Sequence, residues 1–150
     1  MSNEYSEGAA RAIAQDFLDR HGAAAISGDL DEIVRWCDLP CTLESRGQRV
    51  VLTDVAMVRS VSESFIVQVR NKRLTHVIRR CLEAGFRDKD TVMATYETRY
   101  VRDDQLLSEE PYVSFVILRR RGERWKFSNM QFDVGVDSPA GAALSDWNRS

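Results

Sequence analysis

Apolar side chains recur at helical spacing near the start of the chain. Between residues 9 and 27 one stripe is made by Ala10, Ile13, Phe17, His21 and Ala24, which predicts an amphipathic helix. Gly28 stands where a left-handed, helix-terminating residue is expected. Asp29 follows as the N-cap of a second helix, and Glu32 completes a capping-box pattern. Pro40 blocks continuation of that short helix.

The next segment predicts a hairpin and a third helix. Residues 41–45 and 50–53 flank Arg46-Gly47-Gln48, which is a hairpin signal. Thr53 and Asp54 then begin a helix, and its apolar stripe runs to Val69.

From Leu74 the spacing of apolar residues changes to the alternation that is typical of strands. Strands are predicted from residue 74 to a turn at 88–90, over 91–102, from about 106 to 120, and over 125–134. Helices followed by long antiparallel strands predict an α+β fold, in which a curved sheet cups three helices around a hollow. We expect one domain over residues 1–150, with a core at about 8–134 and a loosely held tail at 135–150.

The last two strands predict which side chains face each other. A two-residue turn at Arg121-Gly122 pairs Leu118 with Trp125, Val116 with Phe127, Ser114 with Asn129, and Tyr112 with Gln131. The opposite face then carries Val113, Phe115, Ile117, Met130 and Phe132. Because one layer of helices covers only one face, we expect a second copy of the chain to cover the other.

Composition narrows the classes of function. The chain has 150 residues, 21 basic and 23 acidic, and a net charge of -2, so no global field attracts nucleic acid or an anionic membrane. No apolar run has the roughly 20 residues that a membrane span needs. The polar start does not resemble a signal peptide, and Cys37, Cys41 and Cys81 cannot all pair within one chain. We therefore expect reduced thiols and a cytoplasmic protein.

The order of these elements resembles the nuclear transport factor 2-like (NTF2-like) superfamily, especially its SnoaL-like and ketosteroid-isomerase-like branches. The resemblance rests on Gly28-Asp29-Leu30-Asp31 followed by Ile33-Val34, and on the hairpin from Arg119 to Trp125. It implies a cone-shaped α+β fold, a pocket between sheet and helices, and dimerisation. Members of the superfamily include isomerases, dehydratases, cyclases, epoxide hydrolases and proteins without catalytic activity.

Members of the isomerase branch share three catalytic residues, and the corresponding positions of this chain can be compared with them. Its members use a carboxylate base on the first strand, a tyrosine on the first helix and a protonated aspartate on a late strand, a set that stabilises an enolate. In this chain His21 falls at the tyrosine position, Ser45 at the base position and Ser114 near the aspartate position. The resemblance therefore disfavours isomerisation of the ketosteroid type and leaves the pocket itself in place.

Two histidines are the candidates for acid–base chemistry. His21 lies on the inward stripe of the first helix, and His76 lies between Leu74 and Ile78 on one face of a strand. The ordinary alternative for His21 is a histidine at the edge of the core that is hydrogen-bonded to a neighbour. We expect no metal site, because Cys37 and Cys41 straddle Pro40 and no histidine pair completes a zinc site.

Six further residues are candidates for binding a ligand. They are polar or aromatic side chains expected to reach the pocket, namely Trp36, Tyr96, Arg99, Tyr112, Ser114 and Asn129. Arg99 is the arginine expected to hold an anionic group, and its alternative is a structural ion pair with Glu97 or Glu110. No cofactor is expected, since the eight glycines are scattered and form no phosphate-binding loop.

Two hypotheses of function follow. The first is a small-molecule-binding protein with a helix–sheet pocket, extended in its catalytic form to a cyclase, dehydratase or isomerase that transfers protons. The alternative is a non-catalytic small subunit of a ring-hydroxylating dioxygenase, a branch that residues 72–76 and 97–100 resemble.

Overall fold

Local capping signals fix the three N-terminal helices. The computed structural model describes residues 4–106, 111–135 and 137–149. In it α1 spans Glu7–Ser27 and ends at Gly28, whose φ of 78° lies in the left-handed region. Helix α2 (Leu30–Arg35) begins at Asp29, whose side chain accepts a hydrogen bond from the backbone N–H of Glu32. Helix α3 (Val55–Asn71) is capped in the same way by Asp54, so the predicted starts of α2 and α3 and the predicted end of α1 are confirmed.

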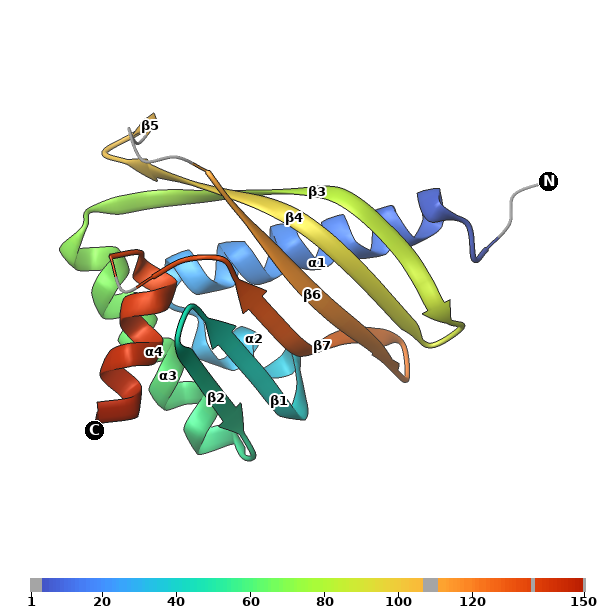
Figure 1. Ribbon diagram of the computed structural model, residues 1–150, viewed down its shortest axis with the longest axis horizontal. Coiled ribbons are helices and arrows are strands. Elements are labelled where there is room, and N and C mark those ends of the chain that lie inside the picture. Colours follow the sequence, from blue (N-terminus) through green and yellow to red (C-terminus); the bar gives the residue numbers. More distant parts are fainter. Residues whose placement is uncertain (1–3, 107–110, 136, 150) are drawn as a thin grey trace.

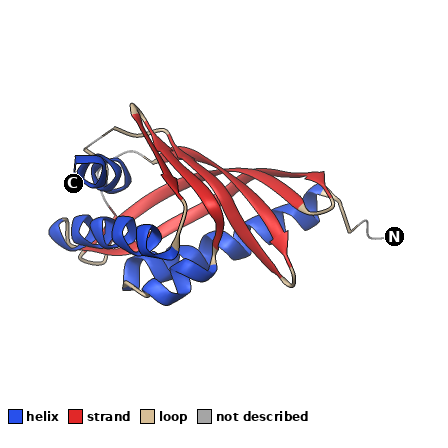
Figure 2. Cartoon of the chain, turned by 90° about the horizontal axis from the view of Figure 1, so that it is seen from below, coloured by secondary structure: helices blue, strands red, loops and turns tan. Residues whose placement is uncertain are grey.

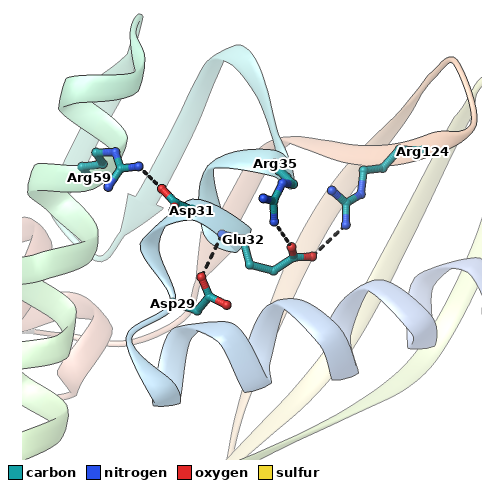
Figure 3. A network of polar contacts seen from close by, with 6 residues as sticks. All are labelled: Asp29, Asp31, Glu32, Arg35, Arg59 and Arg124. Carbon is teal, nitrogen blue, oxygen red and sulfur yellow. Dashed lines mark hydrogen bonds and ion pairs between the residues drawn. The ribbon is translucent and has the colours of Figure 1, made fainter.

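The expected capping box at α2 is only half formed. The Glu32 carboxylate does not reach back to the N-cap and instead lies between two arginines, 2.6 Å from Arg35 Nη1 and 2.7 Å from Arg124 Nη2 (Figure 3). Asp31 pairs with Arg59 of α3. These contacts tie the short helix to its own last turn, to α3 and to the start of β7.

The strands form one mixed sheet. Their bounds are β1 (Cys37–Ser45), β2 (Gln48–Leu52), β3 (Leu74–Asp88), β4 (Thr91–Arg102), β5 (Gln105–Leu106), β6 (Tyr112–Arg121) and β7 (Arg124–Phe132). The order across the sheet is β2-β1-β7-β6-β4-β3, and β5 pairs with β4. Strands β1 and β7 are parallel, and the other pairs are antiparallel. The part of the predicted strand at 107–110 lies outside the described residues.

The helices pack against one face of this twisted sheet. Helix α1 runs along the long strands β3 and β4 (Figure 1), and Figure 2 shows the strands bending over the helical layer. The core between the layers is built from side chains of α1, α2, α3 and the inner sheet face, including Phe17, Ile33, Val58, Tyr96 and Phe127. The expected α+β architecture is therefore confirmed. Within the described ranges, no helix is both long and apolar enough to cross a membrane.

The predicted register of the last hairpin is wrong. Arg121 pairs with Arg124, so the turn consists of Gly122 and Glu123, and Leu118 pairs with Phe127. A register shift then places one extra β7 residue between Phe127 and Asn129. As a result Met130 faces the core opposite Val116, whereas Asn129 lies opposite Ile117 on the outer face.

A second irregularity changes the predicted faces of β3. Leu74 pairs with Arg102 and His76 with Val101, so Thr75 is an extra residue between them. The alternation therefore reverses after Leu74, which is buried. Arg79 faces the helices, and His76 faces solvent with a side chain that is 62% exposed.

The segment expected as a loose tail forms a helix instead. Helix α4 (Pro139–Arg149) packs against α3 and buries Ala140, Ala143 and Leu144. The spacing of these three residues is that of one helical face. Figure 1 shows α4 beside α3, and Ala140 and Leu144 of α4 line the hollow that is described below.

Candidate functional site

A hollow lies between the inner sheet face and helices α1 to α4. Its volume is about 80 Å³. Its wall is mostly aliphatic and aromatic, and the lining includes Ala25, Ile33, Leu43, Val61, Phe65, Phe127, Met130, Phe132 and Leu144. Its polar atoms come from Ser62 and from four side chains that contact one another in pairs, namely His21 with Arg79 and Tyr100 with Tyr112. An apolar cavity with a few convergent polar groups is the usual form of a small-molecule site.

Arg79 and His21 form the first polar pair. Arg79 Nη1 lies 2.9 Å from His21 Nδ1. Because a guanidinium group carries only donors, Arg79 donates and Nδ1 accepts. The imidazole is therefore neutral, with its proton on Nε2. Because Gly22 has no side chain, α1 can lie close to β3 at this point. A Cβ on residue 22 would lie 3.2 Å from Val77 Cγ1 and 3.6 Å from Arg79 Nη1.

Aromatic rings hold His21 in place. Its ring stacks on Phe17 with centroids 5.0 Å apart and meets the Phe127 ring edge-on at 5.4 Å. Burial lowers the pKa of His21 well below its ordinary value, and the positive charge of Arg79 lowers it further. The neutral form is thus fixed by both packing and charge, and it serves Arg79 as a hydrogen-bond acceptor.

Two tyrosines form the second polar pair. The hydroxyl oxygens of Tyr100 and Tyr112 are 2.6 Å apart. Burial raises the pKa of Tyr112 well above its ordinary value, and Tyr100 raises it further. Both tyrosines also line a surface hollow with Thr98, Pro111 and Val134, so they stand between that hollow and the cavity.

The cavity therefore offers hydrogen-bond donors and one fixed cation. Among the described lining residues there is no aspartate or glutamate, and the histidine nitrogen that accepts hydrogen bonds is already engaged by Arg79. Within the described part of the chain, no cluster of three or more histidine, cysteine or acidic side chains is arranged to hold a metal ion. This arrangement is suited to binding and orienting a molecule more than to removing a proton from it.

Three of the sequence-predicted site residues lie away from the cavity. His76 is at the solvent-exposed end of β3, with Nδ1 3.0 Å from Thr75 Oγ1. Arg99 lies on the outer face and donates to Glu97 at 3.1 Å, which is the structural pair weighed as its alternative. Asn129 lies on the same outer face, hydrogen-bonded to Gln131. The predicted pocket positions of these three residues are wrong because register shifts and strand alternation turn them outward.

Three other predicted residues are buried in the core near the cavity. Trp36 packs edge-on against Phe17 at 5.4 Å, and the Arg124 guanidinium lies 4.3 Å from its ring centroid. Tyr96 and Ser114, whose hydroxyls are both buried, are directly paired across β4 and β6. Burial raises the pKa of Tyr96 to about 12. Of the eight predicted site residues, His21 and Tyr112 line the cavity.

Sequence reasoning missed Arg79, Tyr100 and the lining from α4. The signal for Arg79 was present, since alternation sends one of the neighbours Arg79 and Arg80 to the inner face of β3. The bulge at Thr75 decides which one. Tyr100 shares its strand face with Tyr96 and Thr98, both of which are buried.

Comparisons with known proteins place this fold. No protein-family model matches the chain, and no curated protein is similar to it in sequence. A protein of unknown function from Mycobacterium tuberculosis superimposes with a TM-score of 0.68 at 11% identity, covering 92% of this chain and 86% of that one. An NTF2-like protein of unknown function from Shewanella oneidensis gives 0.64 at 13% identity, covering 82% and 98%.

A third similar structure is that of a provisionally named aromatic ring hydroxylase from Novosphingobium aromaticivorans. It superimposes with a TM-score of 0.61 at 15% identity, covering 89% of this chain and 99% of that one. Because the three structures are 11–15% identical to this chain in sequence, the comparison shows a shared arrangement of the backbone. The chain therefore has the α+β fold of the NTF2-like superfamily.

Proposed function

We propose that the protein binds a small, partly apolar organic molecule in the cavity between its sheet and helices. The observation that carries this proposal is the apolar lining, which meets two polar pairs, Arg79–His21 and Tyr100–Tyr112. The cavity volume of about 80 Å³ is below that of ordinary small-molecule sites, so the ligand is restricted to a single small ring, and side chains of the lining must move apart when it binds.

Binding is favoured over acid–base catalysis. A cyclase, dehydratase or isomerase needs a group that takes up a proton near neutral pH. Here the lowered pKa of His21 and the raised pKa of Tyr112 leave both groups neutral, as donors or acceptors of hydrogen bonds. Proton transfer at His21 therefore stays a secondary prediction.

A cavity-filling substitution tests the binding proposal. Ala25 lines the cavity, whereas Ala23, two residues earlier on α1, is exposed. We expect indole, an uncharged aromatic probe, to bind the wild type and the Ala23→Leu variant in saturation-transfer NMR. Ala25→Leu should lose this binding, because the added carbons occupy the ligand space. Equal indole signals from all three proteins would contradict binding in this cavity.

We further propose that the outer sheet face joins two copies of the chain. Val113, Phe115 and Ile117 form an apolar row along β6 on that face, and Val113 is 45% exposed. Glu97 and Arg99 of β4 flank the row with opposite charges. A two-fold axis brings such a patch against itself, so that the apolar rows meet and the charges pair across the interface.

The outer face gives a prediction about oligomeric state. We expect the wild type to sediment as a dimer and Val113→Glu to sediment as a monomer, since it places a charge in the apolar row. Val67→Glu changes a valine that is 50% exposed on α3, and this matched control should stay dimeric. A monomeric wild type would contradict the dimer.

The second candidate function is a structural subunit of a ring-hydroxylating enzyme. The likeness to the provisionally named hydroxylase favours it, and so does an apolar outer face that a different protein could cover. The cytoplasmic location expected from the sequence stays a prediction, and the three free, buried cysteines are in keeping with it.

A further inference from the structure

Arg79 is a cation beside an apolar cavity with no counter-ion on the described part of the chain. None of the ion pairs that join described residues includes it. Its Nε is buried and has no hydrogen-bond partner among the residues that the structure describes. The neighbouring arginine Arg80 is exposed on the opposite strand face. Arg79 is half-buried, and removing part of a cation from water without a partner is costly, so a negative group bound beside it would be stabilised.

The contact with His21 engages one N–H of the guanidinium. Arg79 donates to His21 Nδ1 through Nη1. The edge that does not involve Nη1 carries the Nε–H and one N–H of Nη2, which point in parallel. This edge matches the two oxygens of one carboxylate. His21 thus orients Arg79, because its neutral ring accepts from one nitrogen and leaves the bidentate edge unpaired.

We propose that the cavity ligand is a small organic monocarboxylate whose carboxylate binds the Nε–Nη2 edge of Arg79. This inference rests on the proposed function and specifies its ligand class. Arg79 is the single lysine or arginine among the described lining residues. A phosphate dianion is matched less well, since one guanidinium edge with two donors neutralises only one charge.

The rest of the lining specifies the body of the ligand. The aliphatic and aromatic side chains of the wall, such as Val61, Phe65 and Met130, favour a flat apolar group. The hydroxyls of Tyr100 and Tyr112 offer hydrogen bonds to one polar substituent of that group. A benzoate-like acid combines these features.

Benzoate and benzamide form a matched pair of probes, because they share shape and differ in charge. We expect isothermal titration of the wild type to give benzoate an affinity at least about tenfold higher than benzamide. Arg79→Met should remove this preference while still binding benzamide, which shows that the cavity is intact. Arg79→Lys should keep part of the preference, since it retains charge without the planar fork. Arg80→Met, the exposed neighbour, should behave as the wild type.

Each other outcome overturns the inference in a distinguishable way. If benzamide binds the wild type as tightly as benzoate, or if Arg79→Met keeps the preference for benzoate, the carboxylate site is wrong and small-molecule binding stands. If neither compound binds the wild type and indole also fails to bind, the proposed function fails together with the inference.

Discussion

Phe17→Ala lowers the free energy of unfolding by about 3–5 kcal/mol. The Phe17 side chain is 0% exposed in the centre of the core. Its ring contacts those of His21, Trp36 and Phe127, with centroids 5.0, 5.4 and 5.9 Å away. Truncation removes the transfer free energy of the ring and leaves a void that these neighbours fill only in part.

Denaturant unfolding followed by tryptophan fluorescence measures this loss. Val67→Ala on the exposed side of α3 is the control, and we expect it to change the free energy of unfolding by no more than about 0.5 kcal/mol. The loss at Phe17 should be accompanied by weaker benzoate binding, because the stacked ring also positions His21 and through it Arg79. A loss below about 1 kcal/mol for Phe17→Ala would show that the ring is not packed as described.

His21→Gln flattens the dependence of stability on pH below about pH 6.5. In the folded chain the pKa of His21 is lowered, chiefly by burial. In the unfolded chain it returns to about 6.5. Below that value the unfolded state binds one more proton than the folded state, so the free energy of unfolding falls as the pH falls. The limiting contribution is about 1.4 kcal/mol per pH unit, and it persists down to the folded-state pKa.

The chain contains two histidines, and this makes a clean comparison possible. Urea unfolding between about pH 7.5 and 5 gives the free energy of unfolding as a function of pH for the wild type, His21→Gln and His76→Gln. We expect His76→Gln to follow the wild type, since its side chain is exposed to solvent in the folded protein. His21→Gln should lose most of the slope below about pH 6.5. Parallel curves for wild type and His21→Gln would mean that His21 is not held neutral by burial beside Arg79.

The helices could be predicted from the sequence because their ends are determined locally. Asp29 and Asp54 cap the helices that follow them, and Gly28 takes up the left-handed conformation that ends α1. Such signals act over a few residues and do not depend on the rest of the fold. The same kind of signal was available for α4, where Ala140, Ala143 and Leu144 recur at helical spacing after Pro139.

The candidate site was less predictable because it depends on strand register. A single extra residue at Thr75 turns His76 outward, and the alternation that follows it sends Arg79 inward. A turn displaced to Gly122-Glu123, together with one extra residue in β7, moves Asn129 to the outer face. Bulges arise from contacts across the sheet, so the sequence of one strand does not specify them. His21 was found because helical spacing had already placed it on the buried stripe of α1.

The most direct test of the account is a crystal structure of the protein grown with benzoate. We expect density for the ring inside the cavity between sheet and helices, with the carboxylate on the Nε–Nη2 edge of Arg79. We also expect Arg79 Nη1 to keep its contact with His21 Nδ1. A cavity filled by side chains, or a carboxylate bound away from Arg79, would contradict it.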